Sequence, residues 1–486
     1  MRPGRDGQLG GTRSTRPGLD SKRPQRRSRT VPADLDQVFK AYDVRGVYPE
    51  QLDEDLARRI GRAFIALAGA GTLAIGEDMR PSSSPMAVAL TDGAASQGAD
   101  VIRVGLCSTD MLYYVSGALD VAGIMLTASH NPSQYNGLKL CRPGAVPVGQ
   151  DSGLAELKEM VAAGEPSGAA AAPGSVRSGE GLLTRYGEHV RSFVDKGVLR
   201  PLKVVADAGN GMAGHVLPTV FDGLPFDLVP MYFDLDGTFP NHPADPINPA
   251  NLADLRERVV AEGADVGLAF DGDADRVFLV DERGGIVESS LVCALVSRTM
   301  CEREPGATVL YNLICSRVVP ETILAAGGHP VRTRVGHSFI KAVMASTGAI
   351  FGGEHSGHYY FRDNYRADSG LVASLVVLEV LSRAGMPLSE VLAPYRRYAD
   401  SGEINLRIEG EDPKALLKLI DRVAERYPPE TRDWTDGLTV DTPDWWFNLR
   451  PSNTEPLLRL NAEAKTEPEM ARVRDEVLEM VDGQPA

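Results

Sequence analysis

The sequence has few cysteines, no long apolar run and no excess of positive charge. Five of its 486 residues are cysteine, they form no CxxC pair, and they stand at positions Cys107, Cys141, Cys293, Cys301 and Cys315. An odd, scattered set is typical of small buried side chains rather than a disulfide framework, which indicates a reducing cytoplasm. No apolar run approaches the roughly 18 residues that a membrane span needs, so we expect no membrane partner.

The formal net charge of −15 argues against a general nucleic-acid binder. Basic residues gather only at the start, where the first thirty residues hold nine Lys or Arg against two acids. That segment lacks the apolar stretch of a secretory signal, so we expect residues 1–33 to form a disordered basic arm. Because the rest of the chain is acidic overall, any phosphate group on a substrate would have to be bound by arginines that cluster locally.

The length of 486 residues exceeds what one hydrophobic core supports and suggests roughly three or four domains. Apolar runs at 72–75, 101–104 and 122–125 read as strands, and residues 85–98 read as a helix between two of them. Such alternation is typical of α/β domains with largely parallel strands, and it repeats twice more. The last ninety or so residues instead alternate apolar and polar side chains, which predicts an α+β block with one exposed sheet face.

The first polar loop that follows an apolar run is residues 127–132. Ser129 there can present its hydroxyl to a substrate, and His130 and the later Lys139 can assist proton transfer or neutralise charge. Taken alone, such a Ser-His-Asn tripeptide is more often a turn or a helix cap.

The second loop places Asp271, Asp273 and Asp275 at alternate positions between two apolar runs. Three such carboxylates predict a site for a hard divalent cation, and Mg²⁺ is the ion we expect. The spacing also resembles a calcium-binding EF-hand loop, even to Glu282 at the twelfth position. Arg276 argues against that alternative because it occupies the sixth position, where the EF-hand needs glycine.

The third loop is residues 352–358, where Glu354 and Ser356 offer an acceptor and a donor suited to sugar hydroxyls. An ordinary turn is the alternative. A zinc site at His355 and His358 is disfavoured, because no further ligands are evident nearby.

The fourth loop, near the C-terminus, combines a guanidinium, two hydroxyls and an amide in Arg450, Ser452, Asn453 and Thr454. These groups can cradle a phosphate dianion, although a capping turn explains the same residues.

Together, in this order, the four loops resemble those of the alpha-D-phosphohexomutase family over about residues 34–486. Residues 39–46 and 335–341 are similar to two further signatures of that family. The resemblance implies an α/β fold of three similar α/β domains with mixed sheets plus a smaller C-terminal α+β domain, arranged around a central cleft. The domains expected are 34–180 with the phosphoserine loop, 181–285 with the metal loop, 286–398 with the sugar-binding loop and 399–486 with the phosphate-binding loop.

The resemblance also implies roles for individual residues. Ser129 is the expected phosphoserine, and its oxygen joins Asp271, Asp273 and Asp275 around Mg²⁺. The catalytic set expected is Ser129, His130, Lys139, Arg45 and Arg276. The substrate-binding set expected is Tyr42, His337, Glu354, Ser356, His358, Arg450, Ser452, Asn453 and Thr454. One departure is Ile314, where some relatives carry a lysine that faces the cleft.

The family activity implied is a phosphomannomutase that interconverts mannose 6-phosphate and mannose 1-phosphate through a hexose 1,6-bisphosphate. That bisphosphate is expected to act as both intermediate and activator, and small-molecule hexose phosphates are the expected partners of a monomer or dimer. A phosphoglucomutase, a dual-specificity enzyme and a phosphoglucosamine mutase are the alternatives within the enzyme class. A non-catalytic protein that binds a metal or a sugar phosphate is the alternative outside it.

Overall fold

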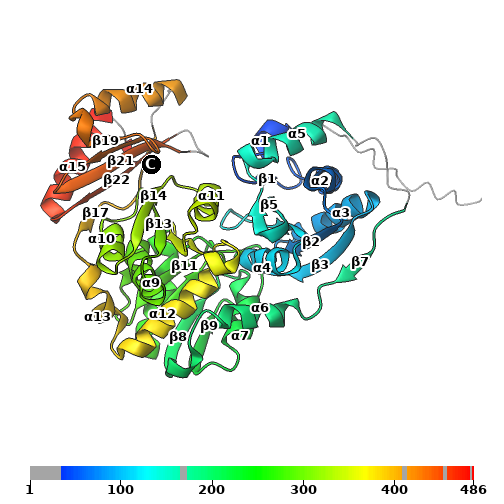
Figure 1. The fold of residues 1–486 in the computed structure, drawn as a ribbon, viewed down its shortest axis with the longest axis horizontal. Helices are drawn as coiled ribbons and strands as arrows, with labels where there is room; N and C mark the ends of the chain where they lie inside the picture. Colours follow the sequence, from blue (N-terminus) through cyan, green and yellow to red (C-terminus); the bar gives the residue numbers. More distant parts are fainter. Residues whose placement is uncertain (1–33, 165–171, 408–412, 453–456, 482–483, 486) are drawn as a thin grey trace, which may run out of the picture.

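The computed structural model describes residues 34–164, 172–407, 413–452, 457–481 and 484–485. Within these residues the chain forms four domains in chain order, each with its own β-sheet (Figure 1). This arrangement confirms the predicted fold class of three α/β domains and a smaller C-terminal one. The predicted basic arm at 1–33 lies outside the described residues.

Domain 1 is built on a seven-stranded mixed sheet. Its strands are β1 (Val44–Val47), β2 (Thr72–Glu77), β3 (Asp100–Leu106), β4 (Ala122–Leu126), β5 (Tyr135–Arg142), β6 (Val146–Pro147) and β7 (Val176–Ser178). Its helices are α1 (Leu35–Val38), α2 (Glu54–Ala68), α3 (Ser83–Ser96), α4 (Thr109–Leu119) and α5 (Leu154–Ala163). Strands β4, β2 and β3 run parallel, and β5 and β1 extend the sheet antiparallel. The loops that follow the carboxyl ends of β2 and β4 therefore lie at the same end of the sheet.

Domain 2 holds a five-stranded sheet ordered β12-β11-β10-β8-β9. The strands are β8 (Leu202–Asp207), β9 (Phe226–Met231), β10 (Val266–Phe270), β11 (Val277–Asp281) and β12 (Ile286–Val287). The helices are α6 (Leu182–Arg191), which precedes the sheet, α7 (Ala213–Phe221) and α8 (Ala253–Glu262). Strands β10 and β11 are buried throughout and pair antiparallel, so residues 271–276 form the hairpin loop between them.

Domain 3 has a four-stranded sheet ordered β14-β13-β15-β16. The strands are β13 (Thr308–Asn312), β14 (His329–Thr333), β15 (Phe351–Gly353) and β16 (Tyr359–Phe361). The helices are α9 (Ser289–Arg303), α10 (Val318–Ala325), α11 (His337–Thr347), α12 (Gly370–Ala384) and α13 (Leu388–Leu392). Helix α12 is apolar on most sides and is buried accordingly. It begins after Ser369, whose side chain accepts a hydrogen bond from the Val372 N–H and caps the helix.

Domain 4 is an antiparallel sheet with two helices. The strands are β17 (Ala399–Asp400), β18 (Ile404–Arg407), β19 (Arg432–Asp433), β20 (Leu438–Asp441), β21 (Trp445–Pro451), β22 (Leu458–Ala464) and β23 (Gln484–Pro485), and the helices are α14 (Pro413–Ala424) and α15 (Glu467–Val481). The expectation of one exposed sheet face is wrong for β21 and β22, where Asn448, Asn461 and Glu463 are buried. Domain 3 covers this face, since the Arg317 backbone N–H donates to Glu463 at 3.1 Å.

The apolar core ties domains 1 to 3 together. One cluster of buried side chains runs from Ile102 in domain 1 through Leu268 in domain 2 to Leu375 in domain 3, whereas domain 4 has a cluster of its own around Phe447. The five cysteines are buried and free, as predicted. No single helix in the described ranges is long and apolar enough to cross a membrane, and one sharply bent pair, α12 with residues 388–395, passes by length and composition alone.

Candidate active site

The loop after β4 holds Ser129 with its backbone in an uncommon conformation. Its φ of 49° lies in the left-handed region that residues other than glycine seldom adopt. The guanidinium of Arg80, buried just beyond β2, donates hydrogen bonds of 2.7 to 2.9 Å to the backbone carbonyl oxygens of Ser129, Asn131, Pro132 and Tyr135. An unfavourable backbone conformation persists only where the surrounding structure holds it. The hydrogen bonds from Arg80 therefore hold this loop in its conformation.

The Ser129 hydroxyl meets the acidic loop, residues 271–276 of domain 2. Oγ donates to Oδ2 of Asp271 at 2.7 Å and lies 3.1 Å from Nδ1 of His130. Arg276 completes the group, because its Nε donates to the same Asp271 oxygen at 2.9 Å. Gly272 permits this approach, since a Cβ there would lie 2.4 Å from the Ser129 carbonyl oxygen.

The acidic loop brings three buried carboxylates together. Asp271, Asp273 and Asp275 each offer an oxygen atom within 4.8 Å of the others. Oδ1 of Asp273 and Oδ1 of Asp275 are buried and lack a hydrogen-bond partner in the part of the chain that the structure describes. Buried acceptors left without donors fit a hard divalent cation.

The EF-hand alternative does not fit this loop. Strand β11 follows it, whereas an EF-hand loop is followed by a helix. Glu282, at the twelfth position, bonds instead to Ser389 in domain 3, whose hydroxyl donates to Oε1 at 2.5 Å.

Lys139 on β5 partly neutralises the acidic loop. Its Nζ donates to Oδ2 of Asp273 at 2.8 Å and to Oδ2 of Asp275 at 2.6 Å. Burial alone would lower the pKa of Lys139, but these two carboxylates raise it well above its ordinary value. Burial raises the pKa of Asp271 to about 8 against the opposing effect of Arg276. For Asp273 the effect of burial is outweighed by Lys139, which holds the pKa of that carboxyl well below its usual range.

Two further residues expected to be catalytic flank Ser129. His130 lies beside Arg276, whose Nη2 is 2.5 Å from Nδ1. Burial, with the nearby charges of Arg276 and Arg45, lowers the pKa of His130 well below its ordinary value. Arg45 bridges Asp43 and Asn131 with hydrogen bonds of 2.5 Å each.

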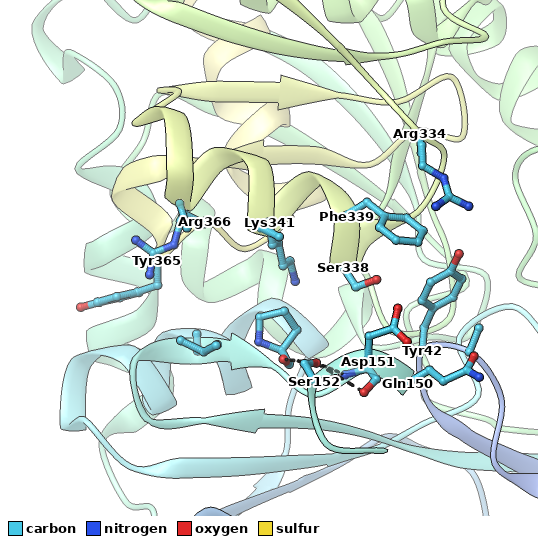
Figure 2. A pocket seen from close by; sticks show the side chains of 17 residues that line it. Tyr42, Gln150, Asp151, Ser152, Arg334, Ser338, Phe339, Lys341, Tyr365 and Arg366 are labelled. Carbon is cyan, nitrogen blue, oxygen red and sulfur yellow. Dashed lines mark hydrogen bonds between the residues drawn. The ribbon is translucent and has the colours of Figure 1, made fainter. Parts of the chain in front are cut away.

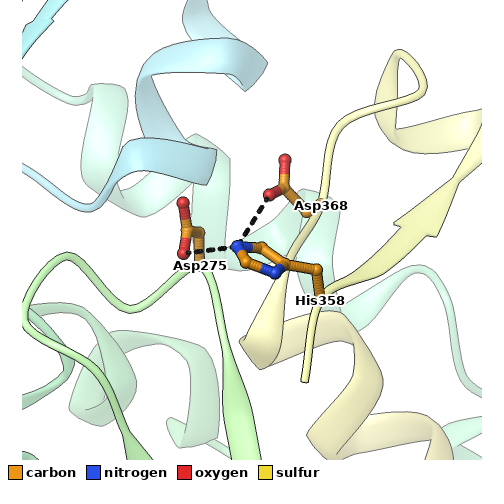
Figure 3. Close-up of side chains that lie close together, drawn as sticks. All are labelled: Asp275, His358 and Asp368. Carbon is orange, nitrogen blue, oxygen red and sulfur yellow. Dashed lines mark ion pairs between the residues drawn. The ribbon is translucent and has the colours of Figure 1, made fainter. Parts of the chain in front are cut away.

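The third-domain loop reaches the acidic loop through His358. Figure 3 shows its ring between two carboxylates, with Nε2 lying 3.7 Å from Asp275 and 3.8 Å from Asp368. Ser356 lies on the other side of the ring, its Oγ 2.9 Å from Nδ1. Glu354 is buried and accepts from the Tyr360 hydroxyl at 2.6 Å and from a backbone N–H at Gly336 at 3.1 Å. The second and third predicted loops therefore meet at one place.

A cavity of about 640 Å³ separates domain 1 from helix α11 (Figure 2). Tyr42 lies at one end, where its ring meets Phe339 edge to face at a centroid distance of 6.0 Å. Lys341 lines the cavity as well and pairs with Asp368 at 2.9 Å. His337 is the first residue of α11.

The predicted phosphate cradle of domain 4 is partly described. Arg450 on β21 is buried, and its Nη2 donates to Glu403 at 2.8 Å. Ser452 follows the strand, with its backbone N–H bonded to the Leu457 carbonyl at 2.8 Å. Asn453 and Thr454 lie outside the described residues. Ile314 is buried where domain 3 meets domain 4.

Sequence reasoning missed Arg80 and Thr109. Asp78 and Arg80 both come directly after the apolar run of β2. Two charged residues in that position could have indicated a buried ion pair that supports a loop. Thr109 starts α4, and its Oγ1 donates to Oδ2 of Asp273 at 2.5 Å. Nothing in the local sequence around Thr109 indicates a contact with a residue 164 positions away.

Four family models match the chain in succession. They describe phosphoglucomutase/phosphomannomutase alpha/beta/alpha domains I, II and III at residues 36–166, 184–285 and 288–398, and the C-terminal domain at 403–480. This chain belongs to the phosphoglucomutase/phosphomannomutase family. Like the family, it is a phosphohexose mutase, an enzyme that moves a phosphoryl group within its substrate.

Relatives of this family cover nearly the whole chain. A protein named phosphohexose mutases from Xanthomonas campestris pv. campestris is 40% identical over 92% of this chain and 98% of its own. A phosphomannomutase from Salmonella montevideo is 39% identical over 91% and 98%. The crystal structure of a phosphoglucomutase/phosphomannomutase family protein from Burkholderia thailandensis has 33% identity and a TM-score of 0.81, covering 93% of this chain and 99% of that one.

Proposed function

We propose that this mutase is a phosphomannomutase that interconverts mannose 6-phosphate and mannose 1-phosphate through a phosphorylated Ser129. The observation that carries the proposal is the 2.7 Å hydrogen bond from the Ser129 hydroxyl to Asp271. A serine oxygen in this position lies beside a carboxylate cluster able to hold a cation and beside the Arg276 guanidinium. Phosphoryl transfer needs such positioning and charge neutralisation.

Mg²⁺, when bound by Asp271, Asp273, Asp275 and an oxygen on Ser129, would neutralise charge on the transferred phosphoryl group. Arg276 and Lys139 add positive charge around the same serine. Arg45 positions the loop through Asn131, and His130 contacts the serine oxygen itself.

The reaction has two phosphoryl transfers. In the first, the P–O bond to Ser129 breaks as a bond forms to the free hydroxyl oxygen of the hexose phosphate, and the proton of that hydroxyl passes to the released serine oxygen, which gives a hexose 1,6-bisphosphate. The bisphosphate then reorients in the site. In the second transfer, the P–O bond between its other phosphoryl group and the sugar oxygen breaks as that group bonds to the serine oxygen, and the sugar oxygen takes up the serine proton. Exclusion of water between the two steps favours transfer over hydrolysis.

Different residues would hold the sugar and the phosphate that is not being transferred. Glu354 and Ser356 would bind sugar hydroxyls, with His358, His337 and Tyr42 beside them. Arg450, Ser452, Asn453 and Thr454 would hold the resting phosphate from domain 4. The burial of Arg450 supports this role, because a guanidinium removed from water binds a phosphate dianion more strongly.

A phosphoglucomutase, a dual-specificity enzyme and a phosphoglucosamine mutase are the alternative activities. The hexoses differ at C2, and no described residue can be assigned to that carbon. The deciding experiment compares kcat/KM for mannose 1-phosphate, glucose 1-phosphate and glucosamine 1-phosphate, with hexose 1,6-bisphosphate added. The highest value for mannose 1-phosphate supports the proposal, and a value at least as high for either other sugar overturns the substrate assignment.

A further inference from the structure

The first residue of helix α4 in domain 1 binds the acidic loop of domain 2. Thr109 is fully buried, and its Oγ1 donates to Oδ2 of Asp273 at 2.5 Å. Its backbone N–H donates to the Asp273 carbonyl oxygen at 3.0 Å. One residue therefore fixes both the side chain and the backbone of Asp273 from another domain.

The two oxygens of the Asp273 carboxylate consequently differ. Oδ2 accepts two hydrogen bonds, from Thr109 and from Lys139 at 2.8 Å. Oδ1 is buried without a partner in the described ranges and belongs to the residue cluster suited to a cation. With Oδ2 occupied by donors, Oδ1 is the oxygen left to bind a cation.

We propose that Thr109 is a positioning residue for the divalent cation, acting by fixing the rotamer of Asp273. This inference rests on the proposed function, because it requires the acidic loop to hold a metal. Residues that hydrogen-bond to a metal ligand and fix its orientation contribute substantially to metal affinity. Their loss typically weakens metal binding about 10- to 100-fold. Because Thr109 acts through Asp273, it is a positioning residue and not a catalytic one.

The neighbouring Asp110 anchors Thr109 to the rest of the molecule. Its buried carboxylate accepts hydrogen bonds of 2.5 Å from three hydroxyl groups, those of Ser108, Tyr186 on α6 and Ser369 at the start of α12. Ser108 belongs to the start of α4 itself, whereas Tyr186 and Ser369 come from domains 2 and 3. The start of α4 is thereby held in place independently of the acidic loop, so Thr109 can act as a fixed support for Asp273.

A simpler explanation is that Thr109 is a buried threonine that only satisfies its own hydroxyl. Thr91 on α3 provides the matched control for that case. It is also buried, and its Oγ1 donates to the Ala87 carbonyl oxygen at 2.7 Å within its own helix. Thr91→Val removes a buried hydroxyl of the same domain without touching the acidic loop.

The test measures binding of Mn²⁺, by electron paramagnetic resonance of the free ion, to the full-length dephosphorylated protein. We expect Thr109→Val to weaken Mn²⁺ binding about tenfold or more, while Thr109→Ser and Thr91→Val stay within about twofold of the wild type. The concentration of Mg²⁺ that gives half-maximal mutase activity should shift in parallel. Should Thr109→Val fail to fold, Thr109→Ala, which removes the same hydroxyl with less bulk, is measured in its place.

The possible outcomes separate this inference from the proposed function. If the wild type binds Mn²⁺ and the variant without the hydroxyl binds it equally well, Thr109 does not position the cation. Equal weakening in Thr109→Ser, which retains a hydroxyl, would also overturn the inference. If the wild type itself binds no Mn²⁺, the metal site and the proposed mechanism fail together.

Discussion

The Ser129 hydroxyl and the Asp271 carboxylate, 142 residues apart in the sequence, are joined by a hydrogen bond of 2.7 Å. The serine lies at the carboxyl end of β4 in domain 1, and the aspartate lies at the carboxyl end of β10 in domain 2. Two strand ends from different sheets thus face each other, which places the serine hydroxyl beside a carboxylate cluster that could hold a cation.

Replacing Arg80 with lysine should lower kcat about 100-fold, with a smaller change in KM. Lysine keeps the charge but cannot reach the four carbonyl oxygens that the guanidinium holds. Steady-state kinetics on mannose 1-phosphate check this prediction. Arg103→Lys is the control, because Arg103 on β3 pairs with Glu77 on the neighbouring strand β2 of the same sheet. An unchanged kcat in folded Arg80→Lys would show that the loop keeps its shape unaided.

Replacing Arg450 with alanine should raise KM by about 10-fold or more, with less effect on kcat. The guanidinium is expected to bind the phosphate that is not transferred, and its removal also leaves Glu403 without that partner. Initial rates over a range of mannose 1-phosphate provide the measurement. Arg472→Ala, which loses only an exposed pair with Glu476, should behave like the wild type. A fall confined to kcat would instead place Arg450 at the transferred group.

Removing divalent cations should abolish turnover without unfolding the protein. The buried carboxylates of the acidic loop would then repel one another at the site of transfer, where charge neutralisation is needed. Activity is measured in excess chelator and again after Mg²⁺ is added, and circular dichroism monitors the fold. Full activity in chelator would contradict the metal assignment.

The stability of the protein should respond to the charge of Asp110. Burial raises the pKa of this carboxyl from 3.8 to about 6, although the hydroxyls that donate to it favour the charged form. The folded state therefore holds the proton more tightly than the unfolded state, so stability attributable to this group falls as pH rises from about 4 to 6 and then levels off.

Urea unfolding at a series of pH values tests this dependence. The free energy of unfolding of the wild type should fall, relative to that of Asp110→Asn, over this pH range. Asp100→Asn provides the control, because hydrogen bonds from Ser175 lower the pKa of Asp100, so the stability that this carboxyl contributes is lost only as pH falls below its ordinary value of 3.8. A constant difference between the wild type and Asp110→Asn would show that the carboxyl has an ordinary pKa.

Short-range patterns in the sequence predicted the strands and the loops that follow them. The acidic loop lies between two apolar runs, and the structure has β10 and β11 there. The third loop, expected at residues 352–358, is shorter, because β15 extends over Phe351–Gly353. Both the successes and this small error reflect periodicity, which locates an element better than it locates its ends.

Contacts between domains were beyond the reach of the sequence patterns. The polar face of β22 was expected in water, yet domain 3 covers Glu463. Thr109 of domain 1 likewise reaches Asp273 of domain 2. Even within domain 1, the patterns did not show that Arg80 reaches a loop 49 or more residues away. Alternation and spacing describe one element at a time, so they cannot show which buried polar side chains find partners across a domain boundary.

We propose that Ser129 carries the phosphoryl group between the two transfers. Intact-mass analysis and peptide mapping of the purified protein after incubation with hexose 1,6-bisphosphate are the sharpest test. We expect one added phosphoryl group located on Ser129, absent from Ser129→Ala, which should also lack mutase turnover. A phosphoryl group on another residue, or normal turnover by Ser129→Ala, would show that Ser129 is not the carrier.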